Sequence, residues 1–417
     1  MTAGQDAAPR FVVPILLCVI PLSQIPLDVY TPALPQMVTD LGSTPAALQA
    51  TVTVYMLGLA IGFIPVGVMA DAWGRTRVLV TCLAVVVLTS VLCALAPGVT
   101  FLLAARFLQG LAACACMVLS YAVAADCFRG AKLTSVSGIL GAAWGLAPVS
   151  APAVGGVLVQ FMSWRAVFAL VAVLAGLVLT VVVLALPETL APADRTQIAV
   201  RATSHAVVQT LRHPVFGCFV LVFGLLASAQ LAFGVAGPFL YQEQLSFEPA
   251  AYGAIALAVG AANLVGELAC GYFAVRTSTR RLAFSALALF GAGTAVLVIT
   301  GLTIGIDAWA LTVGAALALA GCGVLCPQAY GLALGLFTRN LGLVGGIASA
   351  GCYLIVSAAL AAVGALPEND QTTLGWLYAV CGLVALVLLA WATSARRGSN
   401  TVVRQVDSLP SMREQRS

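Results

Sequence analysis

Residues 187–214 read PETLAPADRTQIAVRATSHAVVQTLRHP and form the one long polar stretch in the interior of a strongly apolar chain. Six long apolar runs precede this stretch and six follow it, joined to one another by shorter polar loops. An even division around a long linker is typical of two parallel six-helix halves that enclose a central cavity. The sequence therefore predicts an N-terminal half at 1–189, a linker at 190–214, a C-terminal half at 215–393 and a polar tail at 394–417.

The composition places the chain in a membrane. Of its 417 residues, 61% are hydrophobic and only 8% are charged, and the mean hydropathy is +1.06. A helix needs roughly 20 apolar residues to cross the hydrocarbon core, and the runs have that length. They are continuous rather than alternating, which excludes strands of a barrel. We expect an all-α membrane protein with twelve transmembrane helices, at 11–37, 46–70, 78–95, 100–124, 134–159, 166–186, 215–241, 250–275, 282–302, 308–336, 341–366 and 374–393.

The positive charges fall on one side of these helices. On that side lie 17 of the 19 Lys and Arg residues. They are Arg10, Arg75, Arg77, Arg129, Lys132, Arg195, Arg201, Arg212, Arg276, Arg280, Arg281, Arg339, Arg396, Arg397, Arg404, Arg413 and Arg416. The other side has only Arg165, with acids such as Glu248 and Glu368. The positive-inside rule predicts that the basic side and both termini are cytoplasmic. The first run is too long for a signal peptide and is expected to be a retained helix.

Several classes of function lack the residues they need. The twelve cysteines lie mostly inside the apolar runs without histidine or acidic neighbours, so we expect packing residues and no metal site. The two histidines, His205 and His213, both fall in the linker. No GxxxxGK[ST] phosphate loop occurs, so ATP is not the expected energy source. The net charge of +4 is accounted for by the basic loops and does not indicate nucleic-acid binding.

Five motifs follow one another along the first half. They are Asp28-Val-Tyr30-Thr-Pro32-Ala-Leu-Pro35-Gln-Met37, Gly67-Val-Met-Ala70-Asp71-Ala-Trp-Gly74-Arg75-Thr-Arg77, Arg106-Phe-Leu-Gln109-Gly110, Gly145-Leu-Ala-Pro148 with Pro152-Ala-Val-Gly155-Gly156, and Ser163-Trp164-Arg165-Ala-Val-Phe168. In this order the motifs resemble the major facilitator superfamily. Within it they are similar to the twelve-span drug:proton antiporters of the Bcr/CflA subgroup, associated with bicyclomycin and chloramphenicol resistance.

The loop after the second helix is the expected gate. Glycines permit close approach and a tight turn there, Asp71 can accept from amides at a helix N-terminus, and Arg75 can pair with the carboxylate of Asp126. The resemblance implies that this cluster latches the cytoplasmic side in the outward-facing state. A charged turn that only anchors topology is the alternative. The expected gating residues are Gly67, Asp71, Gly74, Arg75, Arg77 and Asp126.

The fifth helix combines small residues with proline. Small residues let two helix backbones approach closely, and proline loosens the helix so that it can bend. This suits a transporter whose halves rock against each other, although ordinary helix packing produces a similar composition. The resemblance assigns an antiporter motif to Gly145, Pro148, Pro152, Gly155 and Gly156.

Three ionisable residues lie well within the spans: Asp28, Arg106 and Glu267. Such a residue costs about 2.5–3.5 kcal/mol or more near the bilayer centre unless it is paired or hydrated, which makes each a functional candidate. Counting at 1.5 Å per residue puts Asp28 about 13 Å and Arg106 about 9 Å below the same surface. The hypothesis is that Asp28 carries a proton and helps to bind substrate while Arg106 tunes it. A static ion pair at the rim of the cavity is the alternative.

Glu267 belongs to a polar stripe in the eighth helix. Gly260, Asn263, Glu267 and Gly271 follow one another at helical spacing and can line the cavity from the second half. Glu267 is expected to take part in proton coupling or to bind a cationic substrate, and pairing with Arg276 is the alternative. The expected substrate-binding residues are Gln24, Asp28, Tyr30, Tyr55, Trp144, Gln230, Asn263, Glu267 and Gln328. For the aromatic residues among them, packing inside the bundle is the alternative.

These observations predict a proton-coupled exporter of small amphiphilic drugs, such as chloramphenicol- or bicyclomycin-like compounds, that works by alternating access. The expected partners are the substrate, protons and the lipid bilayer, with no nucleic acid, no cofactor and a monomeric chain. The resemblance places the protein in the bacterial cytoplasmic (inner) membrane as an antibiotic-resistance transporter. A major facilitator carrier for a metabolite, such as an amino acid derivative, a sugar or a siderophore, is the alternative. A membrane-embedded enzyme or sensor is disfavoured, because catalytic residue types do not converge at one depth.

Overall fold

The computed structural model describes residues 11–195, 207–337, 341–364 and 370–407. Its described residues form helices and connecting turns without a β-strand. Twelve helices are long and apolar enough to cross a membrane, which confirms the predicted helix number and fold class. The chain is therefore a multi-pass membrane protein. Predictions that concern Arg10, Arg201, His205, Arg339, Glu368, Arg413 and Arg416 lie outside the described residues.

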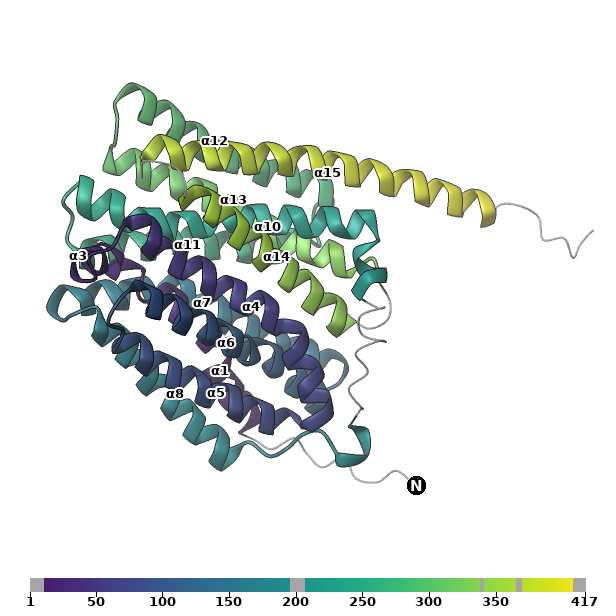
Figure 1. The fold of residues 1–417 in the computed structure, drawn as a ribbon. Coiled ribbons are helices and arrows are strands. Elements are labelled where there is room, and N and C mark those ends of the chain that lie inside the picture. The colour runs from purple at the N-terminus through teal and green to yellow at the C-terminus, as the bar shows by residue number, and fades with distance from the viewer. Residues whose placement is uncertain (1–10, 196–206, 338–340, 365–369, 408–417) are drawn as a thin grey trace, which may run out of the picture.

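Six spans precede the linker and six follow it (Figure 1), and we call these two groups the N-terminal half and the C-terminal half. The N-terminal half consists of a broken first span followed by α4 (Pro45–Trp73), α5 (Arg75–Ala94), α6 (Val99–Cys127), α7 (Gly130–Phe161) and α8 (Arg165–Ala185). A short 3₁₀ turn, η3 (Pro192–Asp194), begins the linker. The C-terminal half consists of α10 (Pro214–Pro238) with the π-helical turn η4 (Phe239–Gln244), then α11 (Pro249–Phe273), α12 (Thr279–Thr303), α13 (Ala308–Leu334), α14 (Leu341–Gly364) and α15 (Gln371–Asp407).

The first span is not the continuous helix that the sequence predicts. It is divided into α1 (Val12–Val19), η1 (Ile20–Ser23), α2 (Ile25–Asp28), η2 (Thr31–Ala33) and α3 (Leu34–Asp40). Prolines stand at the start of four of these pieces, and proline interrupts the helical hydrogen-bond ladder. The amide of Leu27 bonds to the Gln24 carbonyl, which leaves the Ser23 carbonyl free to accept from another helix. The breaks therefore expose main-chain acceptors inside the bundle.

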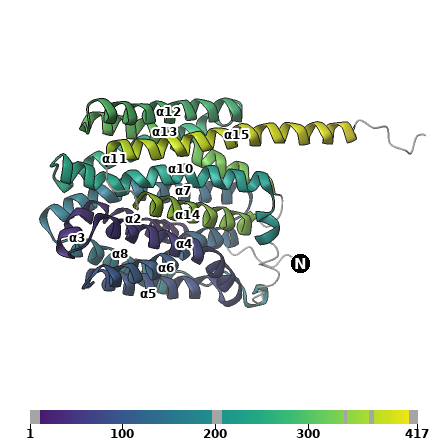
Figure 2. The ribbon, with the colours of Figure 1, turned by 45° about the horizontal axis from the view of Figure 1, so that its top comes forward.

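The last helix is longer than predicted. The sequence suggests that structure ends at 393, yet α15 continues to Asp407. No proline occurs between the end of the apolar run and Pro410, so no strong breaker stops the helix. Figures 1 and 2 both show α15 extending beyond the ends of its neighbours. The boundary drawn at 393 marks a change in polarity and not the end of the helix.

The two ends of the bundle differ in charge. We call the end that carries Arg75, Arg129 and Arg276 the basic end, and the other, which carries Trp164 and Glu248, the opposite end. The halves meet along two seams, the helix pairs α7 against α11 and α4 against α14.

Candidate functional site

Arg106 lies fully buried in α6, inside a cage of aromatic rings. Its guanidinium carbon is 4.4 Å from the centre of the Tyr30 ring and 4.3 Å from the centre of the Tyr55 ring. The Phe168 ring lies farther away, at 5.8 Å. The negative faces of aromatic rings attract a cation, most strongly where water is excluded. The cage therefore holds a positive charge within the N-terminal half.

Hydrogen bonds fix the same guanidinium. Its Nη1 donates to the carbonyl oxygen of Pro26 at 2.9 Å and to Oε1 of Gln109 at 2.6 Å. Gln109 is itself held by Ser90, whose Oγ accepts from Nε2 at 2.7 Å. Nε and Nη2 of Arg106 have no hydrogen-bond partner among the described residues. Arg106 thus clamps the broken first span through a main-chain carbonyl.

Asp28 ends the short helix α2, two residues after the carbonyl that Arg106 binds. Its side chain is buried, and Oδ2 has no hydrogen-bond partner among the described residues. Arg106 is near enough to interact with it electrostatically, but the two side chains do not form an ion pair. The alternative of a static ion pair is therefore wrong for this structure, in which Nη1 of Arg106 donates to Pro26 and Gln109 and not to Asp28.

Asp28 also faces the C-terminal half. Its carboxylate lies within electrostatic range of the hydroxyls of Tyr252 in α11 and Tyr353 in α14. The Tyr353 hydroxyl contacts Oε1 of Gln24 at 3.5 Å, and its ring stacks on Phe63 at 5.6 Å. Gln24 and Asp28 therefore lie where the two halves meet. The sequence does not point to Tyr252, because an aromatic residue at helical spacing gives no sign of facing the other half.

Tyr30 and Tyr55 occupy a different place from the one expected. Both are fully buried, and both hydroxyls are engaged within the N-terminal half. The Tyr30 hydroxyl pairs with Thr51 at 2.8 Å, and the Tyr55 hydroxyl donates to the free Ser23 carbonyl at 2.8 Å. They form the wall that holds Arg106 and do not line an open surface.

Two consecutive glycines in α7, Gly155 and Gly156, pack against two different segments. A methyl group on Gly155 would overlap the carbonyl oxygen of Val29 in the first span, and one on Gly156 would overlap the carbonyl oxygen of Pro249 in α11. Pro148 and Pro152 lie inside the same continuous helix. The motif thus allows α7 to pack backbone-to-backbone against its own half and against the other half at once.

Glu267 lies in α11 on the seam with α7. Its Oε1 accepts from Nδ2 of Asn263 at 2.9 Å, and its Oε2 is directed at Gly145, where an added methyl group would be 3.2 Å away. Oδ1 of Asn263 and Nε1 of Trp144 are buried without a hydrogen-bond partner among the described residues. Asn263 and Glu267 therefore lie together on α11 beside Gly145 of α7, with unused hydrogen-bonding capacity.

Two interpretations of the second half, those of Arg276 and Gln328, turn out differently. Arg276 donates to the Tyr272 carbonyl at 2.8 Å and stacks on the Tyr272 ring at 3.7 Å, so pairing with Glu267 is wrong for this structure. Gln328 donates to the Thr279 carbonyl at 3.0 Å, toward α12 of its own half and away from the seams. Gln230 is half-buried in α10.

The expected gate forms a network whose partners all lie before residue 190, so in this structure it does not latch the two halves together at the basic end, as the resemblance implies. Arg75 pairs with Asp71, and its Nε lies 3.2 Å from Oδ2 of Asp126. Thr189 donates to the same Asp126 oxygen at 3.2 Å. Oε1 of Glu188, and not Asp71, accepts from the amide of Arg75 at the start of α5, at 2.8 Å. The sequence does not predict Glu188 at this place, because it lies 113 residues after Arg75 in the chain.

The glycines of this gate are not equivalent. Gly74 has φ of 107°, a conformation that favours glycine, and an added methyl group would overlap the Glu188 carboxylate. At Gly67 the nearest atom to an added methyl group, in Val118, is 3.9 Å away, so the expected close approach does not occur there. Arg77 is exposed.

The halves are joined at the opposite end and part toward the basic end. Gln242 donates to the Pro32 carbonyl at 2.9 Å, and Gln160 donates to Glu248. Toward the basic end, Gly138 of α7 and Gly271 of α11 face open space, and residues 271–281 are all exposed. In Figure 1 the ribbons of α5 and α8 slope away from α10 and α15 toward this end. The structure is therefore closed on one side of the buried charges.

Sequence comparison identifies relatives over most of the chain. The family model described as Major Facilitator Superfamily matches residues 16–303. The chain is 29% identical over 323 residues to the uncharacterized MFS-type transporter YdgK of Bacillus subtilis, a match that covers 75% of this chain and 80% of that protein. It is 31% identical over 255 residues to the multidrug resistance protein MdtL of Escherichia coli O157:H7, covering 60% of this chain and 64% of MdtL.

Solved structures share the fold at low sequence identity. A crystal structure of the peptide transporter POT in complex with sulfate superimposes with a TM-score of 0.73 at 15% identity, covering 94% of this chain and 99% of that one. A D-xylose-proton symporter superimposes with a TM-score of 0.69 at 16% identity, covering 90% and 95%. At this identity the likeness concerns the arrangement of the helices alone.

Proposed function

The chain belongs to the Major Facilitator Superfamily of transporters, and we propose that it is a proton-coupled antiporter that exports small amphiphilic drugs by alternating access. We further propose that it is of the Bcr/CflA type and lies in the bacterial inner membrane with its basic end in the cytoplasm. Two features support drug export: the relationship to MdtL and the order of the five motifs in the first half. The excess of Arg and Lys at the basic end supports the orientation.

Asp28 is the observation that carries the proposal. Desolvation favours the protonated form of a buried carboxyl group, whereas a nearby cation favours the charged form. Asp28 is subject to both effects, because it is buried with one unbonded oxygen and the fixed charge of Arg106 is close. Its position where the halves meet means that rocking of the halves changes its surroundings. A small change in hydration is then enough to load or release a proton.

The open side gives a direction to the cycle. With the basic end in the cytoplasm, the structure is inward-facing, ready to take up substrate from the cytoplasm in exchange for a proton. The α7–α11 seam then holds the outer side closed through Gly156 and the Gln160–Glu248 hydrogen bond. Substrate binds between Asp28 on one half and Glu267 on the other, with Trp144 and Tyr353 as apolar contacts.

Transport by inverted vesicles tests the proposal. Inverted vesicles that contain the full chain are energised with a proton gradient whose acidic side is the vesicle lumen. Labelled chloramphenicol or bicyclomycin is supplied outside. We expect gradient-dependent uptake by the wild type and none by Asp28→Asn. Glu243→Gln removes an exposed acid at the opposite end and serves as the matched control, with uptake retained. Uptake by Asp28→Asn equal to that of the wild type would show that Asp28 is not the proton carrier.

Growth tests separate the drug exporter from a metabolite carrier. Cells that express the chain are challenged with a panel of antibiotics that includes chloramphenicol and bicyclomycin. Protection by the wild type, lost in Asp28→Asn, supports drug export. Protection against none of them, together with export of a single cell metabolite, contradicts it and identifies a metabolite carrier.

A further inference from the structure

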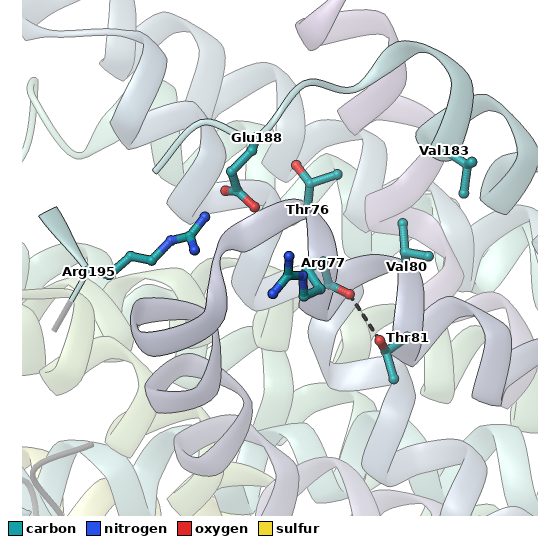
Figure 3. A pocket seen from close by; sticks show the side chains of 7 residues that line it. All are labelled: Thr76, Arg77, Val80, Thr81, Val183, Glu188 and Arg195. Atoms are coloured by element: carbon teal, nitrogen blue, oxygen red, sulfur yellow. Dashed lines mark hydrogen bonds between the residues drawn. The ribbon is translucent and has the colours of Figure 1, made fainter. Parts of the chain in front are cut away.

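A pocket outside the central seams lies at the basic end of the N-terminal half, between α5 and α8. It has a volume of about 430 Å³, within the range of ~300–1,000 Å³ that is usual for small-molecule sites. Its lining residues are Thr76, Arg77, Val80, Thr81, Val183, Glu188 and Arg195 (Figure 3). None of the transport steps proposed above uses this pocket.

The charge of the pocket is positive. Figure 3 shows the side chains of Arg77 and Arg195 on the same side of the pocket, near Glu188. The one carboxylate of the lining belongs to Glu188, whose Oε1 accepts from the amides of Arg75 at 2.8 Å and Leu190 at 3.1 Å, so the lining has two positive charges against one negative charge. Neither arginine forms an ion pair with a carboxylate of the described residues. Two guanidinium groups are therefore available to one ligand.

Two further features favour an anion. Nε of Arg195 is buried and has no hydrogen-bond partner among the described residues, although its residue is only half-buried. Arg77 lies in the first turn of α5, a helix of 20 residues whose N-terminus carries a partial positive charge. The hydroxyls of Thr76 and Thr81 already donate to the main chain, to Pro187 and Arg77, so the arginines are the principal donors.

The apolar part of the pocket indicates the source of that anion. Val80 and Val183 lie together on one side of it (Figure 3), and Val183 is 57% exposed. The helix that carries Val183, α8, is the least buried of the twelve spans and so borders the lipid. A ligand that reaches both the arginines and the valines has a charged group at the helix ends and an apolar group beside the helix.

We propose that this pocket binds the phosphate headgroup of an anionic phospholipid, with Arg77 and Arg195 on the phosphate and with Val80 and Val183 beside the acyl chains. Basic pockets between transmembrane helices are suited to such headgroups, since arginine binds phosphate through paired hydrogen bonds. The inference is independent of the transported substrate and of the direction of transport.

Binding of phosphatidylglycerol to the purified full chain in neutral detergent tests the proposal. The affinity is measured by native mass spectrometry for the wild type, Arg77→Gln/Arg195→Gln and the control Arg280→Gln/Arg281→Gln. The control removes two exposed arginines from the first turn of α12, at the same end in the other half. We expect the wild type and the control to bind phosphatidylglycerol alike and the pocket variant to bind at least about tenfold more weakly, as the loss of one charge-assisted hydrogen bond or more predicts.

Two further measurements keep the test decisive if the double variant unfolds. Thr81→Glu leaves both arginines in place but offers them a competing carboxylate, and we expect a similar loss. Arg77→Lys/Arg195→Lys keeps both charges, and we expect partial retention of binding. The proposal is overturned if Arg77→Gln/Arg195→Gln and Thr81→Glu bind phosphatidylglycerol as tightly as the wild type. It is also overturned if the α12 control loses as much affinity as the pocket variants.

Inorganic phosphate distinguishes the two possible sources of the anion. We expect millimolar phosphate not to displace phosphatidylglycerol, because phosphate makes no contact with the valines. Displacement by phosphate, with phosphate binding lost in Arg77→Gln/Arg195→Gln, would contradict the lipid assignment and identify a site for a soluble anion.

Discussion

The two halves hold their buried acids in different ways. In the N-terminal half, Asp28 lies on a broken span beside a caged arginine that is fully buried. In the C-terminal half, Glu267 lies on the continuous helix α11, half-buried, with the amide of Asn263 as its partner. The first acid has a fixed counter-charge nearby and the second does not. This difference favours proton exchange at Asp28 and ligand contact at Glu267.

The basic ends of the two halves also differ in how many side-chain contacts hold them together. The N-terminal half joins α4, α5, α6 and the linker through Arg75, Asp71, Asp126 and Glu188. At the corresponding turn of the C-terminal half, the Arg276 side chain bonds to the main chain and stacks on the ring of Tyr272, and it forms no ion pair among the described residues. One half is therefore braced at its basic end, whereas the turn of the other is free to move with α11 and α12.

Replacement of Arg106 should have the largest effect on the N-terminal half. Arg106→Gln removes the cation between Tyr30 and Tyr55 and the donor to Pro26. Charge-assisted hydrogen bonds contribute about 1.5–3 kcal/mol and a desolvated cation–π contact about 2 kcal/mol, so we expect a loss of about 3–5 kcal/mol in unfolding free energy. Thermal unfolding in detergent measures it. An unchanged midpoint would show that the cage does not hold the first span.

The paired glycines of α7 provide the next comparison. Gly156→Ala places a methyl group against the Pro249 carbonyl, so we expect the opposite end not to close and transport to fall by about tenfold or more, a cost of at least about 1.4 kcal/mol in the closed state. Gly138→Ala, on the same helix, faces open space and is the control. Vesicle uptake compares them. Equal uptake by both variants would refute close packing at Gly156 as a requirement.

Glu267 should affect substrate choice more than energy coupling. Glu267→Gln keeps the size of the side chain and its contact with Asn263 but removes the charge that a cationic substrate needs. We expect uptake of a cationic dye such as ethidium to fall at least about tenfold, as for a lost ion contact of about 1.4 kcal/mol or more, with chloramphenicol uptake changed less than about twofold. An equal loss for both compounds would instead place Glu267 in the proton pathway.

The smallest change in unfolding free energy is expected for contacts at the basic ends of the two halves. Glu188→Ala removes the side chain that accepts from the first amide of α5, and the loss of such a cap costs about 0.5–2 kcal/mol. Arg276→Ala removes a solvent-exposed contact in the C-terminal half, and we expect a change below about 0.5 kcal/mol. Chemical unfolding of the two variants compares the halves. A larger loss for Arg276→Ala would reverse the assignment of the braced half.

Much of the fold follows from the sequence because length and hydropathy mark each span. The twelve spans rest on local composition, and the structure has them. The division into two halves at the linker stays a prediction. The breaks in the first span were missed, because a run of apolar residues masks the effect of its prolines. The continuation of α15 to Asp407 was missed for a related reason, since polarity and helix formation are separate properties.

The candidate site was predicted as a set of residues and not as an arrangement. Asp28, Arg106 and Glu267 stand out, because buried charge in an apolar span is conspicuous. Their partners come from distant parts of the chain: the Pro26 carbonyl for Arg106 and Gly145 for Glu267. Neither a main-chain acceptor nor a glycine carries a sequence signal of its role. Because the surroundings of Arg106 could not be predicted, Tyr30 and Tyr55 were expected in the substrate site, whereas they pack against Arg106.

The most direct test of proton coupling at Asp28 is proton release on substrate binding. Purified protein in a weakly buffered, pH-sensitive dye solution is mixed with saturating chloramphenicol or bicyclomycin. We predict a release of protons from the wild type and from Glu243→Gln, and none from Asp28→Asn. Release from Asp28→Asn that equals the wild type, with substrate still bound, would contradict the account.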